Sequence, residues 1–225
     1  TAARAGAAAG DRPGDRPGEG AGEGAGERAG GRGDGWAGLP EGGLVTVSYV
    51  LGELAEETRE ALVTRAVRAA GADGAVVLVE PGTPDGFRRI LAARDRMTAE
   101  GMTVLAPCPH SARCPLGTGG DWCHFAARTA RSALHRRIKG AELAWEDEKF
   151  SYVAAVGPGL AADRAGDGPA GGRIVRRPRQ RKGQVLLELC TAGEGLRSAT
   201  VTRRDPERYR AARDAAWGDP WADPR

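Results

Sequence analysis

The chain has 225 residues, a formal net charge of +3 and 40% hydrophobic residues, so it is long enough for one ordinary domain. Its 35 glycines and 14 prolines indicate that part of it does not pack into that domain. The mild net charge does not by itself argue for nucleic-acid binding. No apolar run is long enough to span a bilayer, so we expect no membrane partner.

Residues 1–43 consist almost entirely of Ala, Gly, Arg, Asp, Glu and Pro, with a repeated Gly-Asp-Arg-Pro. Such a segment has little apolar surface to offset the entropy lost on ordering, so we expect a disordered tail. It lacks the apolar core of a secretory signal, and its acidic residues are unusual for an organellar transit peptide. We therefore expect a cytoplasmic protein.

The rest of the chain alternates apolar runs with helix-like stretches, which predicts an α/β domain with parallel strands over residues 44–221. Leu44–Val50 and Ala75–Val79 are typical of strands buried on both faces. An amphipathic stretch follows each of them and ends at a glycine, Gly71 or Gly101. We further expect a short strand at 103–106, a basic helix at about 122–139, an extended run at 150–156, a flexible loop at 157–172, strands at 184–190 and 197–202, and a final helix from 206 to about 217.

The cysteines are the strongest local signal for chemistry. They are Cys108, Cys114 and Cys123, which lie close together, and the distant Cys190, which ends a predicted strand. A chain without an export signal is not expected to form disulfides, because the cytosol keeps thiols reduced. Four thiolates are what an iron–sulfur cluster or a structural zinc ion requires, and the spacing leaves both open. Four unrelated cysteines are the alternative, and His110 or His124 could replace a thiolate ligand.

Positive charge gathers in two parts of the sequence. The predicted helix after the cysteines carries Arg128, Arg131, Arg136, Arg137 and Lys139. A second cluster without acidic residues comprises Arg173, Arg176, Arg177, Arg179, Arg181 and Lys182. Clusters of this kind attract phosphates, so we predict that these residues bind RNA. The alternative is a solvated surface, which is what most charge runs form.

Several sequence blocks occur in an order that is typical of one family. They are Ser48–Leu54, Val79–Pro84, the Cys-Pro-His and Cys-Pro-Leu motifs, Asp121–Phe125, Leu134–Gly140 and Glu146–Tyr152. In these blocks, from about Trp36 to Trp221, the chain resembles the methyltransferase-like proteins associated with the small ribosomal subunit, which comprise bacterial proteins and mitochondrial assembly factors. The resemblance implies a partial class I (Rossmann-like) methyltransferase sheet with an inserted four-cysteine metal site.

The same resemblance implies partners and cofactors. A [4Fe–4S] cluster is expected on Cys108, Cys114, Cys123 and Cys190, and the expected partners are small-subunit ribosomal RNA and the assembling small ribosomal subunit. The implied function is subunit assembly or translation. The alternatives are an active RNA methyltransferase and a zinc-stabilised structural module.

Methyl transfer would require S-adenosylmethionine, which class I methyltransferases bind through a glycine-rich turn after the first strand and an acidic residue ending the second. Neither feature is found, because the Gly-x-Gly spacings within residues 1–43 follow no apolar strand. The resemblance therefore implies that the chain begins at the family's fourth strand. Glu53, Glu80 and Gly82 remain as candidates for weak cofactor contact, and the catalytic residues stay unknown.

Overall fold

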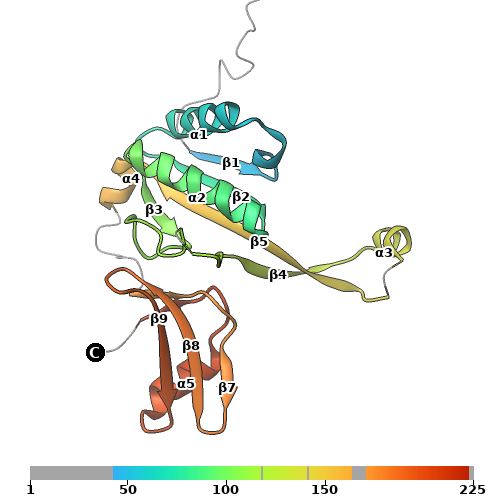
Figure 1. Ribbon diagram of the computed structural model, residues 1–225, viewed down its shortest axis with the longest axis vertical. Coiled ribbons are helices and arrows are strands. Elements are labelled where there is room, and N and C mark those ends of the chain that lie inside the picture. Colours follow the sequence, from blue (N-terminus) through green and yellow to red (C-terminus); the bar gives the residue numbers. More distant parts are fainter. Residues whose placement is uncertain (1–42, 118, 141, 164–170, 223–225) are drawn as a thin grey trace, which may run out of the picture. The chain divides into compact units, whose positions relative to one another are not determined.

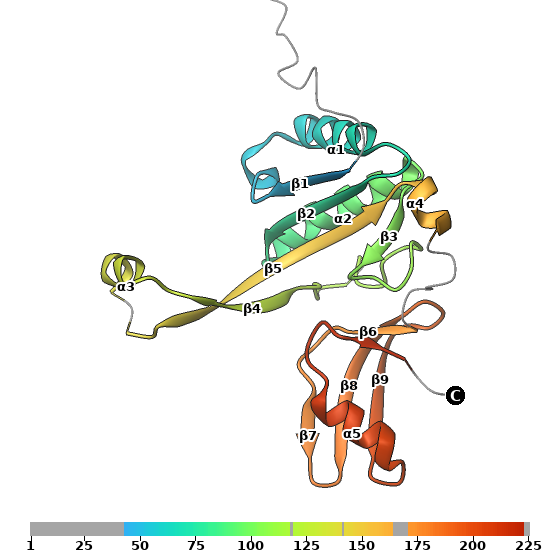
Figure 2. The same cartoon turned by 180° about the vertical axis from the view of Figure 1, so that it is seen from behind.

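The computed structural model describes residues 43–117, 119–140, 142–163 and 171–222. The predicted disordered tail lies outside the described residues apart from Gly43. The strands, shown in Figures 1 and 2, are β1 Leu44–Ser48, β2 Ala75–Pro81, β3 Thr103–Ala106, β4 Phe125–Ala130, β5 Trp145–Val156, β6 Gly172–Ile174, β7 Arg179–Arg181, β8 Gln184–Thr191, β9 Gly195–Thr202 and β10 Pro220–Trp221. The helices are α1 Glu56–Ala70, α2 Pro84–Ala99, α3 Ala133–Lys139, α4 Pro158–Asp163 and α5 Pro206–Asp214, with a 3₁₀ turn at Leu51–Glu53.

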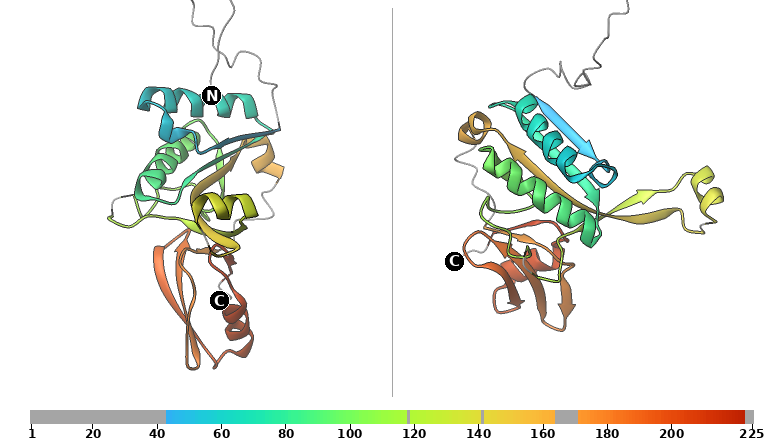
Figure 3. Two further views of the ribbon diagram at one scale, coloured as in Figure 1. Left: turned by 90° about the vertical axis from the view of Figure 1, so that its right-hand side faces the viewer. Right: turned by 45° about the horizontal axis from the view of Figure 1, so that its top comes forward.

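The first sheet has the strand order β1-β2-β5-β3, and β4 pairs with β5. β1 and β2 are parallel, as predicted, but β5 runs antiparallel to both β2 and β3. The predicted wholly parallel sheet is therefore wrong, and the sheet is mixed. The crossovers β1–α1–β2 and β2–α2–β3 advance across the sheet in the same direction, so right-handed connections place both helices on one face. Figures 1 and 3 show α1 and α2 side by side on that face.

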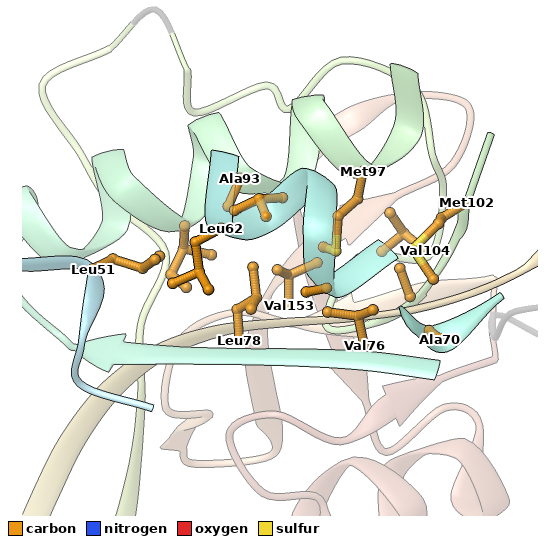
Figure 4. Packing of buried hydrophobic residues seen from close by; sticks show 14 residues of the cluster. Leu51, Leu62, Ala70, Val76, Leu78, Ala93, Met97, Met102, Val104 and Val153 are labelled. Atoms are coloured by element: carbon orange, nitrogen blue, oxygen red, sulfur yellow. The ribbon is translucent and has the colours of Figure 1, made fainter. Parts of the chain in front are cut away.

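The core of this sheet lies between the two helices and the strands, as Figure 4 shows. Apolar residues at helical spacing point inward, so α1 and α2 bury one face each. α2 begins at Pro84, and the Thr83 hydroxyl caps this helix by accepting a hydrogen bond from Gly86 N at 3.1 Å. The buried cluster includes Leu51, Leu62, Ala70, Val76, Leu78, Ala93, Met97, Met102, Val104 and Val153. These strand–helix units confirm the prediction from local patterns.

The segment after the cysteines differs from its prediction. The expected helix at about 122–139 is wrong, because the chain forms β4, which pairs with β5 from Phe125↔Phe150 to Ala130↔Trp145, and the short helix α3. We call this hairpin, residues 125–150, the arm; Figure 1 shows it extending away from the sheet with α3 at its tip. Ala and Arg favour a helix, but the backbone hydrogen bonds offered by β5 override that weak preference.

The second sheet is antiparallel and has β8 at its centre. β9 pairs along one side of β8, while β6 and β7 pair with different parts of the other side, and β10 extends β6. Its core comprises Ile174, Val185, Leu187, Leu189, Ala199, Val201, Ala212 and Trp221. β8 and β9 confirm the two predicted closing strands, but they belong to a sheet of their own (Figure 2).

The remaining predictions concern class and connections. The mixed α/β class is confirmed, whereas a Rossmann-like methyltransferase sheet stays a prediction. α4 begins within the predicted loop 157–172, of which residues 164–170 lie outside the described residues, and α5 ends at Asp214 rather than near Trp217. Across the described ranges, no helix combines the length and apolar character needed to cross a membrane.

Candidate metal centre and nucleic-acid interface

The four cysteines come together in space. Cys108, Cys114 and Cys123 lie in the connection between β3 and β4, and Cys190 lies near the end of β8 in the second sheet. All four line one cavity of about 30 Å³, and all are free thiols. The rest of the lining is mainly apolar. The fold thus brings Cys190 close to three thiols that lie far from it in the sequence.

The thiols are not already arranged around a single ion. Within the described residues, no three His, Cys, Asp or Glu side chains stand at the spacing that one metal ion requires. A space of about 30 Å³ suits a water molecule, so a larger group would require the segment 107–124 to move outward. The donor set fits an iron–sulfur cluster or zinc in chemistry and number, because both bind thiolates in fours. Cys108, Cys114, Cys123 and Cys190 would hold either group.

Burial controls the charge of these thiols. It raises the pKa of Cys123 and also that of Cys190, the latter to about 12, and the neighbouring cysteines raise both further. Burial also raises the pKa of Cys108, against the opposing charge of Arg94. These thiols are therefore neutral near pH 7 without a bound metal, and metal binding would release protons.

Hydrogen bonds hold the cysteine segment against the sheet. Arg94 on α2 is buried and donates through Nη2 to the carbonyls of His110 at 3.0 Å and Ala112 at 2.5 Å. The Ser111 hydroxyl accepts from Val104 N at 3.0 Å, and the Ser151 hydroxyl donates to the Cys123 carbonyl at 2.7 Å. The positions of the thiols therefore depend on α2, β3 and β5 together.

The two candidate histidines have different surroundings. His110 places Nε2 3.7 Å from Cys190 Sγ, and its Nδ1 lies 3.1 Å from the Ala112 carbonyl oxygen. His124 instead packs between Trp122 and Trp217, with ring centroids 5.3 Å and 5.0 Å away. Burial lowers the pKa of both histidines. The structure brings His110 beside a candidate ligand and His124 into an aromatic cluster.

Part of the positive charge on the arm is paired with acidic residues of β5. Arg128 binds Asp147 through Nε at 2.8 Å and lies over the Trp145 ring, 3.5 Å from its centroid. Arg131 pairs with Glu146 at 2.6 Å, and Lys139 Nζ is 4.0 Å from the same carboxylate. The sequence shows the acidic run 146–148, but only the hairpin register places it opposite the basic residues. Arg136 and Arg137 lie in the last turn of α3.

The second basic cluster separates into two groups. Arg173 is half-buried and donates to the carbonyls of Pro107 at 2.8 Å and Gly218 at 2.9 Å. Arg176 binds the Asp121 carboxylate and donates to the Trp122 carbonyl at 3.3 Å. These arginines hold the cysteine segment. The exposed members are Arg177, Arg179, which lies 3.5 Å from Glu188, Arg181 and Lys182.

The candidate cofactor residues mostly have structural partners. Glu80 is buried, accepts a hydrogen bond from Leu51 N at 2.9 Å and pairs with Arg89 at 2.8 Å. Gly82 packs so closely that a Cβ there would lie 2.7 Å from Phe150 N, and its carbonyl accepts from Trp122 Nε1 at 3.0 Å. Glu53 is exposed in the 3₁₀ turn. Contact of these residues with S-adenosylmethionine stays a prediction.

Comparison with known proteins gives a consistent result. The sequence profile of the family described as mitochondrial small ribosomal subunit Rsm22 matches residues 31–222. Two curated proteins of Schizosaccharomyces pombe, Rsm22-cox11 tandem protein 1, mitochondrial, and Rsm22-cox11 tandem protein 2, mitochondrial, are each 26% identical to the chain. The similarity covers 65% of this chain and 24% of each relative, so the chain spans about a quarter of their length.

Proposed function

This chain belongs to the Rsm22 family, and we propose that it serves small-subunit assembly or translation by binding a [4Fe–4S] cluster and small-subunit ribosomal RNA. The family connects the chain with the small ribosomal subunit. The cluster, the RNA contact and a cytoplasmic location are finer statements that belong to the proposal, and the names of both curated relatives place those proteins in mitochondria. One observation carries the proposal: four free thiols, three from the connection between β3 and β4 and one from β8, line one cavity.

The arrangement of the thiols supports a structural role for the cluster. When bound, a cluster would supply four thiolate bonds that link the connection 107–124 to β8. The local apolar core there is small, with Phe87, Cys114 and Leu116 buried and Trp122 packed against them. A metal group would therefore add cross-links where apolar burial alone is limited. In the apo chain, Cys114 and Cys123 form part of this small core, and Cys108 packs against the core of the first sheet.

Basic residues on the arm support RNA contact. Arg137 and Lys139 are exposed in the last turn of α3 at the tip of the arm, Arg136 beside them is half-buried, and Leu134 and Ile138 are exposed on the same helix. Arg177 lies near the arm, since its charge adds to the hydrogen bond from Arg128 in lowering the pKa of Asp147. Cations on the arm and at Arg177 can therefore contact phosphates of one extended RNA backbone.

Absorption spectroscopy and iron analysis of anaerobically purified protein test the cluster. We expect a broad band near about 400 nm and about four iron atoms per chain, whereas d¹⁰ zinc gives no such band. A colourless protein with one zinc ion per chain would instead support the zinc-stabilised module. The matched control is the fourfold cysteine-to-serine chain, which should carry neither metal.

RNA contact is tested separately, so that each half of the proposal can fail alone. Binding of the full chain to small-subunit ribosomal RNA should weaken steeply with salt, since each phosphate contact releases about 0.7–0.9 of a counterion. Equal, salt-insensitive binding to RNA and to an uncharged polymer would refute this part. The cluster result would be unaffected.

A further inference from the structure

Arginines from α2, from β6 and from the connection after β6 contact the cysteine segment. They are Arg94 on α2, Arg173 on β6 and Arg176, which follows Val175 in the connection after β6. Each guanidinium donates to backbone carbonyls, and among the acceptors Pro107, His110, Ala112 and Trp122 are within two residues of a cysteine. The same side chains therefore determine where the thiols stand.

Arg176 is paired with the Asp121 carboxylate, but the charges of Arg94 and Arg173 are less well balanced by other side chains. A carbonyl accepts a hydrogen bond but carries no net charge, so a guanidinium bound to carbonyls keeps its positive charge. The Arg94 side chain is 3% exposed. Its Nη1 lies 3.2 Å from Oδ1 of Asp95, whose side chain is 57% exposed. The buried Nε of Arg94 has no hydrogen-bond partner within the described part of the chain. A cation in such a place is costly unless a negative group lies nearby.

The four cysteines are the groups that could supply that negative charge. Arg94 lines the same cavity as the four cysteines. Arg173 donates to the Pro107 carbonyl beside Cys108, and Arg176 donates to the Trp122 carbonyl beside Cys123. Each guanidinium therefore lies near at least one cysteine.

We propose that Arg94, Arg173 and Arg176 are positioning residues of the cluster site, which hold the cysteine segment by its carbonyls, and that Arg94 and Arg173 also offset the negative charge of the thiolate-bound cluster. This inference rests on the proposed function, because it requires the cluster. It also changes the assignment of Arg173 and Arg176, which the sequence placed among the RNA-binding residues. The exposed Arg177, Arg181 and Lys182 keep that assignment.

The midpoint potential for one-electron reduction of the cluster tests whether the charge of an arginine acts on the cluster. In a chain that holds the cluster, one electron supplied by dithionite would make the site more negative by one unit, and a nearby cation would favour that step. The Arg173 guanidinium donates to carbonyls, which carry no net charge, so Arg173→Gln in the reconstituted full chain should lower the midpoint potential by up to about 59 mV, a tenfold change in the reduction equilibrium. Arg173→Lys keeps the charge and should stay close to the unchanged protein. Arg179→Gln is the matched control, because it removes a charge on β7 away from the cavity.

A second measurement covers the buried arginine. Arg94→Gln and Arg94→Lys should both fold, as circular dichroism would show, and Arg94→Gln should lose iron to a chelator severalfold faster than Arg94→Lys. Arg173 variants serve the same comparison if the Arg94 variants do not fold, because Arg173 is only half-buried.

The outcomes separate the two proposals. An unchanged chain that acquires no iron under anaerobic reconstitution would overturn the proposed function and this inference with it. A normal cluster whose potential and iron loss are the same in Arg173→Gln, Arg173→Lys and the unchanged chain would overturn the inference alone. Equal shifts in the Gln and Lys variants would do so as well, since the charge would then be irrelevant.

Discussion

Arginine serves opposite purposes in the cysteine segment and on the arm. Beside the cysteines, Arg94 and Arg173 are buried or half-buried and donate to carbonyls. On the arm, Arg128 and Arg131 bind carboxylates across the hairpin. Carbonyl partners leave the positive charge in place, whereas carboxylate partners cancel it. The partner of an arginine, rather than its position in a basic run, therefore decides whether its charge is available to attract another anion.

The two regions also differ in how they are held. The cysteine segment lies between two packed sheets and has buried apolar neighbours such as Phe87 and Leu116. The arm depends on a two-stranded pairing and on ion pairs across that pairing, and ion pairs of this kind contribute little to stability. We therefore expect changes in the cysteine segment to affect stability and changes on the arm to affect binding.

The largest expected effect comes from removing a thiolate. Cys190→Ser should lose most of the iron and lower the melting temperature of the cluster-loaded chain by roughly 10 °C, because the cross-link to β8 is lost. In the apo chain the same change should cost only about 1 kcal/mol, since it alters one buried atom. Calorimetry of both forms with iron analysis makes the comparison. Full iron content and unchanged melting would remove Cys190 from the ligand set.

A stability comparison between the sheet core and the arm should show the next largest effect. Leu78 is fully buried in the first core, so Leu78→Ala should cost about 2–5 kcal/mol in the free energy of unfolding. Ile138 is 74% exposed on α3, so Ile138→Ala should change it by about 0.5 kcal/mol or less. Urea titrations measure both. A large loss in Ile138→Ala would mean that the arm packs against another part of the chain.

RNA binding should depend on the tip of the arm. Replacing Arg136, Arg137 and Lys139 with Gln should reduce the salt dependence of RNA binding by about two units of slope and weaken binding uniformly across RNA sequences. The matched control replaces three exposed arginines on other helices, Arg68, Arg210 and Arg213. Equal losses in both triple variants would show that only net charge matters.

The paired arginines of the arm allow a sharper version of that test. Arg128→Gln should weaken RNA binding less than Arg137→Gln, because Asp147 already cancels the charge of Arg128. Filter binding at several salt concentrations measures this difference. If Arg128→Gln has the larger effect, the ion pair must open when RNA binds.

The smallest expected effect is a pH dependence of the arm. The hydrogen bond from Arg131 lowers the pKa of Glu146 below its ordinary 4.5, and the bond from Arg128 lowers that of Asp147. A carboxyl whose pKa is lower in the folded state stabilises that state above its unfolded pKa, and this contribution is lost as the pH falls through the folded pKa. The arm should therefore loosen below about pH 4 while the cores persist.

The indole NMR signal of Trp145, assigned with Trp145→Phe, reports this loosening because Arg128 lies over that ring. Glu146→Gln together with Asp147→Asn should abolish the pH dependence. A signal that moves equally in this double variant would assign the change to another titrating group.

Local patterns in the sequence were sufficient for the strand–helix units. Apolar runs separated by amphipathic stretches that end at Gly71 and Gly101 record which face each element buries, and this signal is contained within the element itself. The cysteines could likewise be grouped from their spacing. Their placement around one cavity, however, depends on β8 of the second sheet lying beside the cysteine segment.

Tertiary structure alone decided the arm and the roles of the basic residues. Residues 125–130 have side chains that suit a helix, and only pairing with β5 makes them a strand. Arg173 and Arg177 stand in the same basic run, yet one reaches the Pro107 carbonyl and the other faces solvent. A sequence fixes the charge of a side chain, while its function depends on which atoms the folded chain brings within hydrogen-bonding distance.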